Sequence, residues 1–154
     1  TVGMSLHKVY RRAYERKFKN LNYSVTTGHL ETSYFHDKTN ILFNLSYGKY
    51  LAGDRGYTLD LSRVFDSGFR TGFYFTRTNV SFELFGEGSF DKGFYFSIPF
   101  DIFSNNYSRG NLNFRFAPLT RDGGQKLLIN KPLKGIIFNS NEYSINKSWN
   151  EYLN

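Results

Sequence analysis

Three carboxylates that lie close together are the residues most able to do chemistry in this sequence. Glu83, Glu87 and Asp91 share a stretch that also contains several glycines. Two carboxyl groups can act as acid and base in glycoside hydrolysis when the fold fixes their separation. Nothing in the sequence fixes that separation, and the glycines are typical of a loop whose backbone needs unusual angles. We therefore predict a structural loop here and no catalytic residues.

Other reactive arrangements are missing from the sequence. There is no cysteine, so neither a disulfide nor a thiolate metal site can form. The three histidines, His7, His29 and His36, do not have the spacing of a zinc site. The glycine-rich run 86–93 is not followed by a helical pattern, as a phosphate-binding loop would be. We expect no metal, no cofactor and no enzymatic activity.

The basic residues suggest binding more than catalysis. A net charge of +7 is compatible with affinity for nucleic acid, anionic lipid or acidic glycan. No stacking motif and no single basic face is present, so we expect no nucleic-acid partner. Four residues form the candidate polar set: Asp60, Arg70, Arg109 and Arg115. They could hydrogen-bond sugar hydroxyls and attract anionic glycans, or the arginines could simply pair with Asp60 or Asp101 inside a polar interior.

The elements that position this set show alternating polarity. In 40–51, Ile41, Phe43 and Leu45 alternate with Asn44 and Ser46, so one face of a strand is apolar and the other is small and polar. About a dozen residues suffice to cross a bilayer as a tilted strand. No run of about 18 apolar residues exists that could form a transmembrane helix.

Repetition of this pattern predicts an all-β fold. The expected strands are 2–17, 23–35, 40–51, 57–65, 69–78, 93–103, 110–117 and 135–143, with a helix as the alternative for 11–17. Pro99 should cause a bulge or break in its strand. We predict an antiparallel up-and-down meander of about eight strands, a transmembrane β-barrel or the terminal segment of a larger one. It would occupy residues 1–143, and residues 144–154 would form a C-terminal tail.

Loop lengths and charges indicate an orientation. The turns 36–39, 66–68 and 104–109 would lie at one end, and 18–22, 52–56, 79–92 and 118–134 at the other. Outer-membrane barrels have short periplasmic turns and longer external loops, which places the tail in the periplasm. With the apolar faces toward lipid, Asp60, Arg70 and Arg115 point inward, and the reverse would cost roughly 2–4 kcal/mol for Arg70 alone. The alternative is a soluble carbohydrate-binding β-sandwich in which the apolar faces form a core.

Six motifs in order resemble one protein family. They are Tyr23–Leu30 (YSVTTGHL), Gly48–Gly56 (GKYLAGDRG), Leu59–Gly68 (LDLSRVFDSG), Phe85–Gly93 (FGEGSFDKG), Phe96–Asp101 (FSIPFD) and Pro118–Gly124 (PLTRDGG). Their order and spacing, from about Arg11 to Leu128, are similar to the C-terminal part of the YjbH exopolysaccharide-biosynthesis family. That family includes the GfcD proteins of capsule operons.

The resemblance implies a place in the outer membrane of a Gram-negative bacterium. It also implies a role in exopolysaccharide or capsule biosynthesis or export. Members are several times longer, so this chain resembles one segment of a larger barrel. The implied partners are outer-membrane lipid, polysaccharide, and other export proteins or further barrel strands. The family-motif loops hold Gly86, Glu87, Gly88, Asp91, Lys92, Arg121 and Asp122.

Overall fold

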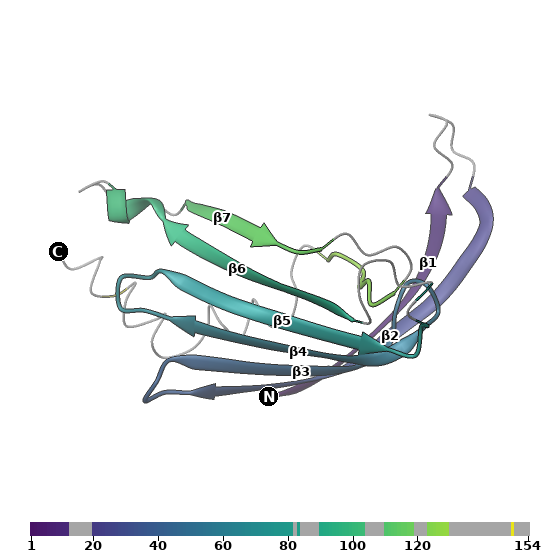
Figure 1. The fold of residues 1–154 in the computed structure, drawn as a ribbon, viewed down its shortest axis with the longest axis horizontal. Helices are drawn as coiled ribbons and strands as arrows, with labels where there is room; N and C mark the ends of the chain where they lie inside the picture. The colour runs from purple at the N-terminus through teal and green to yellow at the C-terminus, as the bar shows by residue number, and fades with distance from the viewer. Residues whose placement is uncertain are drawn as a thin grey trace.

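One antiparallel sheet makes up the computed structural model, which describes residues 1–12, 20–81, 83, 90–103, 110–118, 123–129 and 149. Its strands are β1 (Val2–Arg12), β2 (Asn20–His36), β3 (Ile41–Lys49), β4 (Arg55–Val64), β5 (Arg70–Thr78), β6 (Asp91–Pro99) and β7 (Asn111–Phe116). Each strand pairs with the next in the chain, in the order β1 to β7 (Figure 1). The predicted all-β, up-and-down meander is confirmed.

Some predicted boundaries differ from the observed ones. β1 ends at Arg12, and residues 13–19 lie outside the described part of the chain, as does the expected strand 135–143. The strand expected over 93–103 ends at Pro99, and a short 3-10 turn, η1 (Phe100–Phe103), follows. Proline has no N–H to continue the ladder, so the break expected at Pro99 becomes the end of the strand.

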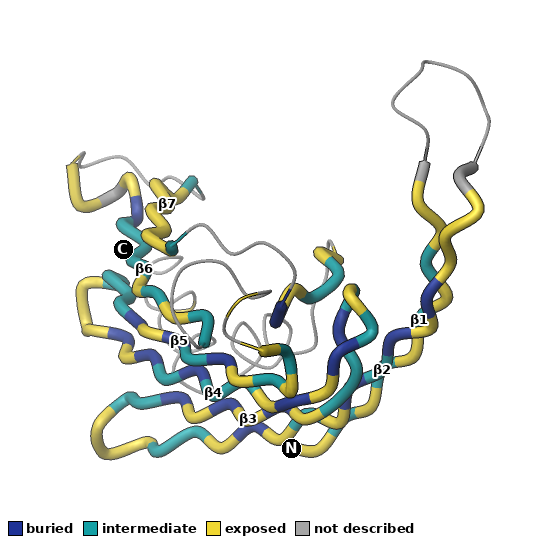
Figure 2. Tube along the Cα trace, turned by 45° about the vertical axis from the view of Figure 1, so that its right-hand side comes forward, coloured by how far each residue is buried: buried dark blue, intermediate teal, exposed yellow. Residues whose placement is uncertain are grey.

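The sheet curls strongly, so that it has an inner and an outer face (Figures 1 and 2). Residues 123–129 lie against the inner face, where Lys126 and Gly124 bond to strand and loop residues. Within the described residues, no helix is long and apolar enough to cross a membrane.

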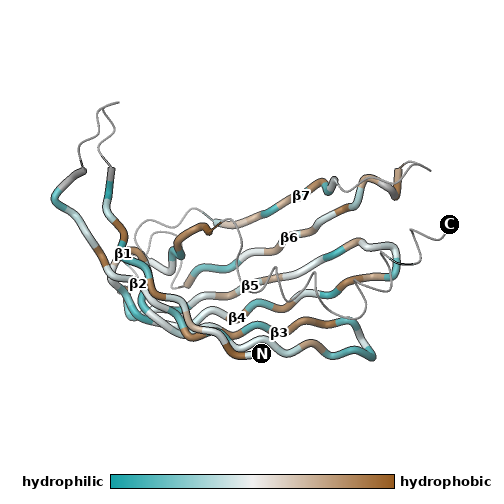
Figure 3. The backbone as a smooth tube through the Cα atoms, turned by 180° about the vertical axis from the view of Figure 1, so that it is seen from behind, coloured by the Kyte–Doolittle hydropathy of each residue, from teal (hydrophilic) through white to brown (hydrophobic). Residues whose placement is uncertain are grey.

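The outer face is apolar and exposed. Met4 is 82% exposed, Phe73 55% and Leu45 50%. In the ladder, Leu45 pairs with Leu59, and Leu59 pairs with Phe75. Alternating hydropathy along the strands is visible in Figure 3. Aromatic rings also stack between β6 and β7, with 4.8 Å between the centroids of Phe94 and Phe116.

The inner face carries mostly small polar side chains, and these are buried. Those with little exposure include Thr27, Ser33, Asn44, Ser46, Asp60, Ser62 and Thr76. In a water-soluble sheet the apolar side is the one that is packed away from solvent. Here the polar side is buried and the apolar side is open, the reverse arrangement.

Close strand contact at Gly48 allows a direct test of this register. A Cβ at Gly48 would lie 2.0 Å from the carbonyl oxygen of Gly28 and 2.7 Å from the Cα of His29. A Cβ at Gly28 would instead meet its nearest atoms at 3.1 Å, one of them at the movable end of Leu6.

We predict that Gly48→Ala destabilises the sheet by about 1–3 kcal/mol, because backbone atoms must shift to admit the methyl group. Gly28→Ala is the matched control and should cost less. Urea unfolding followed by far-ultraviolet circular dichroism measures both. Equal stability of the two variants would contradict the register described here.

Candidate functional site on the inner face

Asp60, Arg70 and Arg115 share the inner face of the sheet. Asp60 lies opposite Tyr74 in the β4–β5 ladder, and Arg115 lies opposite Tyr95 in the β6–β7 ladder. Asp60 is 7% exposed. The common face agrees with the predicted alternation, while a polysaccharide-facing role stays a prediction. Arg109 lies outside the described residues.

A tyrosine packed over a glycine organises the first polar group. Tyr95 lies opposite Gly72, and a Cβ at Gly72 would come within 2.6 Å of the Tyr95 ring. The Tyr95 hydroxyl donates to Oδ1 of Asp60 at 2.9 Å. The guanidinium of Arg70 lies 5.7 Å from the Tyr95 ring centroid and donates to Oγ of Ser62 at 3.1 Å. These contacts join β4, β5 and β6 on the inner face.

A similar arrangement recurs with the two strands exchanged, the tyrosine on β5 and the glycine on β6. Tyr74 lies opposite Gly93, and a Cβ at Gly93 would come within 2.7 Å of the Tyr74 ring. The Tyr74 hydroxyl donates to Oδ1 of Asp91 at 3.3 Å, and the Arg115 guanidinium lies 4.6 Å from the ring centroid. Each unit therefore combines a tyrosine over a glycine, a carboxylate on its hydroxyl and an arginine on its ring.

The two units show what the described arginines contact. The sequence suggested cations available to an anionic ligand, or arginines paired with Asp60 or Asp101. In the structure each arginine packs on a tyrosine that is itself bonded to a carboxylate. The side chain of Asp101 lies outside the described residues. The inner face over the described strands thus offers charges of both signs, hydroxyl groups and aromatic rings close together.

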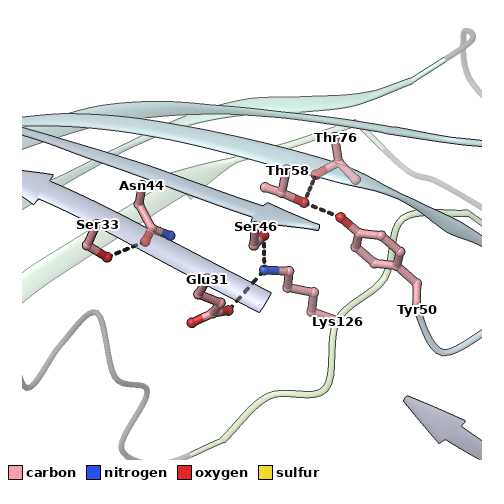
Figure 4. Close-up of polar contacts among 8 residues, drawn as sticks. All are labelled: Glu31, Ser33, Asn44, Ser46, Tyr50, Thr58, Thr76 and Lys126. Carbon is pink, nitrogen blue, oxygen red and sulfur yellow. Dashed lines mark hydrogen bonds and ion pairs between the residues drawn. The ribbon is translucent and has the colours of Figure 1, made fainter. Parts of the chain in front are cut away.

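Residues 123–129 form an inner strap across this face. Lys126 forms an ion pair of 3.3 Å with Glu31 and donates to Oγ of Ser46 (Figure 4). The backbone N–H of Gly124 donates to Oδ2 of Asp54 at 2.9 Å, and the N–H of Leu51 donates to the carbonyl of Gln125 at 3.0 Å.

The sequence predicts a loop over 118–134, and residues 123–129 have no regular secondary structure. That they fold back onto the inner face is not predicted by the sequence. The inward carboxylates of Glu31 and Asp54 supply acceptors that hold the segment against the sheet. The inward parity of Glu31 was readable from the sequence. Its pairing with Lys126, far along the chain, was not.

A line of hydroxyl groups lies beside the strap. Tyr50 is fully buried, its hydroxyl lies 2.6 Å from Oγ1 of Thr58, and that atom lies 2.8 Å from Oγ1 of Thr76 (Figure 4). Burial raises the pKa of the Tyr50 phenol to about 12, so it remains neutral. The His29 ring meets the Tyr50 ring edge-on, with 4.8 Å between centroids.

The remaining predicted site residues divide into two groups. Gly86, Glu87, Gly88, Arg121 and Asp122 lie outside the described residues. Asp91 and Lys92, expected in a loop, are instead the first residues of β6, where they pair with Thr76 and Phe75. The ladder to β5 extends to Asp91, whose carboxylate also accepts a hydrogen bond from the Tyr74 hydroxyl. In the described part of the chain, no three His, Cys, Asp or Glu residues gather as a metal site requires.

Comparison with known proteins identifies the family. The model of the YjbH family, described as "Exopolysaccharide biosynthesis protein YbjH", matches residues 1–137. The chain belongs to the YjbH exopolysaccharide biosynthesis family. A relative in Escherichia coli (strain K12), the "Uncharacterized lipoprotein YjbH", is 48% identical over 118 residues. That match covers 75% of this chain and 17% of the relative, so this YjbH-family chain spans a small part of its relative's length. No solved structure matches.

The Tyr95–Asp60 bond in this YjbH-family chain can be tested by removing one oxygen. Tyr95→Phe keeps the ring over Gly72 but takes a donor from a buried carboxylate, which should destabilise the protein by about 1–3 kcal/mol. Tyr47→Phe is the control, because Tyr47 is 61% exposed on the outer face. Urea titration gives both free energies of unfolding. If Tyr95→Phe left the free energy of unfolding unchanged, the bond would be dispensable for stability.

Proposed function

We propose that this chain is a strand segment of an outer-membrane β-barrel that assists the production or export of exopolysaccharide without catalysing a reaction. The family membership supports the link to exopolysaccharide. The observation that carries the membrane assignment is the reversed polarity of the sheet, with an open apolar face and a buried polar one.

An apolar face of this extent needs an apolar environment. Contiguous exposed apolar surface on a soluble monomer seldom exceeds a few hundred Å² and marks an interaction site. The outer residues of all seven described strands continue one another across the ladder, which is the arrangement of a lipid-facing barrel wall. The proposed localisation is the outer membrane of a Gram-negative bacterium, and the relative is named a lipoprotein of such a bacterium.

The inner face suits contact with a polysaccharide. Sugars present hydroxyl groups that need donors and acceptors, together with C–H faces that pack on aromatic rings. The Asp60–Tyr95–Arg70 and Asp91–Tyr74–Arg115 units supply all three kinds of group. Because the described charges of these units balance, the wall favours hydrogen bonding over strong anion capture, which allows a polymer to bind and leave.

The soluble β-sandwich is the second candidate. A sandwich buries the apolar face of one sheet against another. The described strands form one sheet, and its apolar residues stay open. This observation favours the barrel over the sandwich.

The depth of the apolar face in the membrane gives a sharp test. Phe73→Arg, in the middle of the face, should cost about 2–4 kcal/mol in lipid, whereas Tyr57→Arg, close to a strand end, should cost about 0–1 kcal/mol. Folded protein in the outer-membrane fraction, scored by heat-modifiable gel migration, measures the difference. Equal tolerance of both variants, with protein soluble in buffer, would rule out the barrel.

The role in export is tested by the inner arginines. In cells lacking the native gene, the full-length protein with Arg70→Gln and Arg115→Gln should restore several-fold less secreted polysaccharide than wild type, because both tyrosine units lose their cation. Arg63→Gln, on the outer face, is the matched control. Immunoblotting confirms equal abundance in the membrane. Full secretion by the double variant would show that these residues do not contact the polymer.

A further inference from the structure

Five basic side chains gather on the outer face at one end of the strands. They are Lys8 of β1, Lys49 of β3, Arg55 of β4, Arg77 of β5 and Lys92 of β6. The ladder places them on the apolar face, since Lys49 pairs with Arg55, Tyr57 pairs with Arg77, and Phe75 pairs with Lys92. We call these residues the basic row. The opposite end of the same face carries Arg63.

From one strand to the next, the basic row shifts along the strand direction, and the slope of this shift matches the tilt of strands in membrane barrels. Arg77 pairs with Tyr57, two positions along β4 from Arg55, and Lys92 pairs with Phe75, two positions along β5 from Arg77. From β3 to β6 this is about 13 Å along the strands and about 14 Å across three strand spacings. The resulting slope of about 43° falls within the 35–45° tilt of barrel strands.

The hairpin ends are staggered in the same direction. β3 ends at Lys49 opposite Arg55, whereas β6 begins at Asp91 opposite Thr76, further down the ladder. In a barrel with this tilt, the basic row therefore lies at one depth.

Charge balance around the basic row calls for an anion from outside the described chain. Lys49 and Arg55 are directly opposite each other on one face, an arrangement of like charges that is unfavourable by itself. The carboxylates of the described strands, Glu31, Asp60 and Asp91, all lie on the inner face. Within the described residues, none of the five cations forms an ion pair with a carboxylate. Lys92 does lie 4.8 Å from the centroid of the Phe90 ring, and Lys8 5.5 Å from that of Tyr10.

The side chains next to the basic row indicate what that anion is. The neighbouring positions toward the strand centres hold Tyr47, Tyr57 and Phe75, and the next hold Leu45, Leu59 and Phe73. The sequence of apolar, aromatic and cationic levels is that of acyl chains, membrane interface and headgroups.

We propose that the basic row binds the phosphate groups of lipid headgroups in the outer leaflet. This inference rests on the proposed function together with the orientation predicted from the loop lengths, in which the long-loop end of the sheet lies outside. Arginine can bind a phosphate through two parallel hydrogen bonds, and a neighbouring lysine adds positive charge. We therefore expect the Lys49–Arg55 pair to be the main phosphate-binding position of the row.

The test compares phosphorylated with phosphate-free lipid on the full-length protein. The protein is reconstituted in phosphatidylcholine nanodiscs containing either bisphosphorylated lipid A or its dephosphorylated form, and retained lipid is counted by native mass spectrometry. Wild type should retain the phosphorylated form alone. A variant with four changes, Lys49→Gln, Arg55→Gln, Arg77→Gln and Lys92→Gln, should retain at least about tenfold less phosphorylated lipid A than wild type. The Arg63→Gln variant should retain as much as wild type.

Two further arms keep the outcomes distinct. Lys49→Gln with Arg55→Gln removes the opposed charges without threatening the ladder, so it should insert normally and still show reduced retention. Inorganic phosphate at the same phosphate concentration should not displace the lipid. Unchanged retention in the variants, or displacement by inorganic phosphate, overturns the proposal. Failure of wild type to reach the outer membrane would instead refute the proposed function.

Discussion

Backbone pairing, more than the few apolar side chains buried among the described residues, is the interaction on which this structure depends. Six consecutive ladders connect the seven described strands, and the side chains buried on the inner face are largely hydroxyl, amide and carboxylate groups. In water, such a sheet would lack the burial of apolar surface that normally offsets chain entropy. In lipid, every strand N–H and C=O must be paired within the protein, and a laddered sheet satisfies that demand. The polarity of the two faces therefore fits the membrane environment proposed above.

Arginine shows how strand parity decides the use of a residue. Arg70 and Arg115 are at inward positions and pack on tyrosines that hold carboxylates. Arg55 and Arg77 are at outward positions on the same strands or their neighbours, and in the described residues they pair with no carboxylate. A shift of one residue in register would exchange these surroundings completely. The side-chain chemistry of the sheet is therefore a consequence of its register.

Much of the fold could be predicted from the sequence because the alternation in β3, β4, β5 and β7 is a local property. The common face of Asp60, Arg70 and Arg115 follows from it. The tyrosine-over-glycine units could not be predicted, since each depends on which residue of one strand meets which residue of the next. The position of Lys126 against Glu31 depends on a contact between distant parts of the chain. The glycines that precede Asp91 predict a loop, whereas its backbone pairs with Thr76 of β5 as the first residue of β6.

The inner strap affects the bore of the proposed barrel. A wide barrel leaves a channel whose width grows with the number of strands. Here part of that width is taken up by the protein's own backbone, fastened to the wall at Asp54, Leu51 and Glu31. A polymer in transit along this side of the proposed barrel would meet the peptide groups of the strap before it reached the strands behind them.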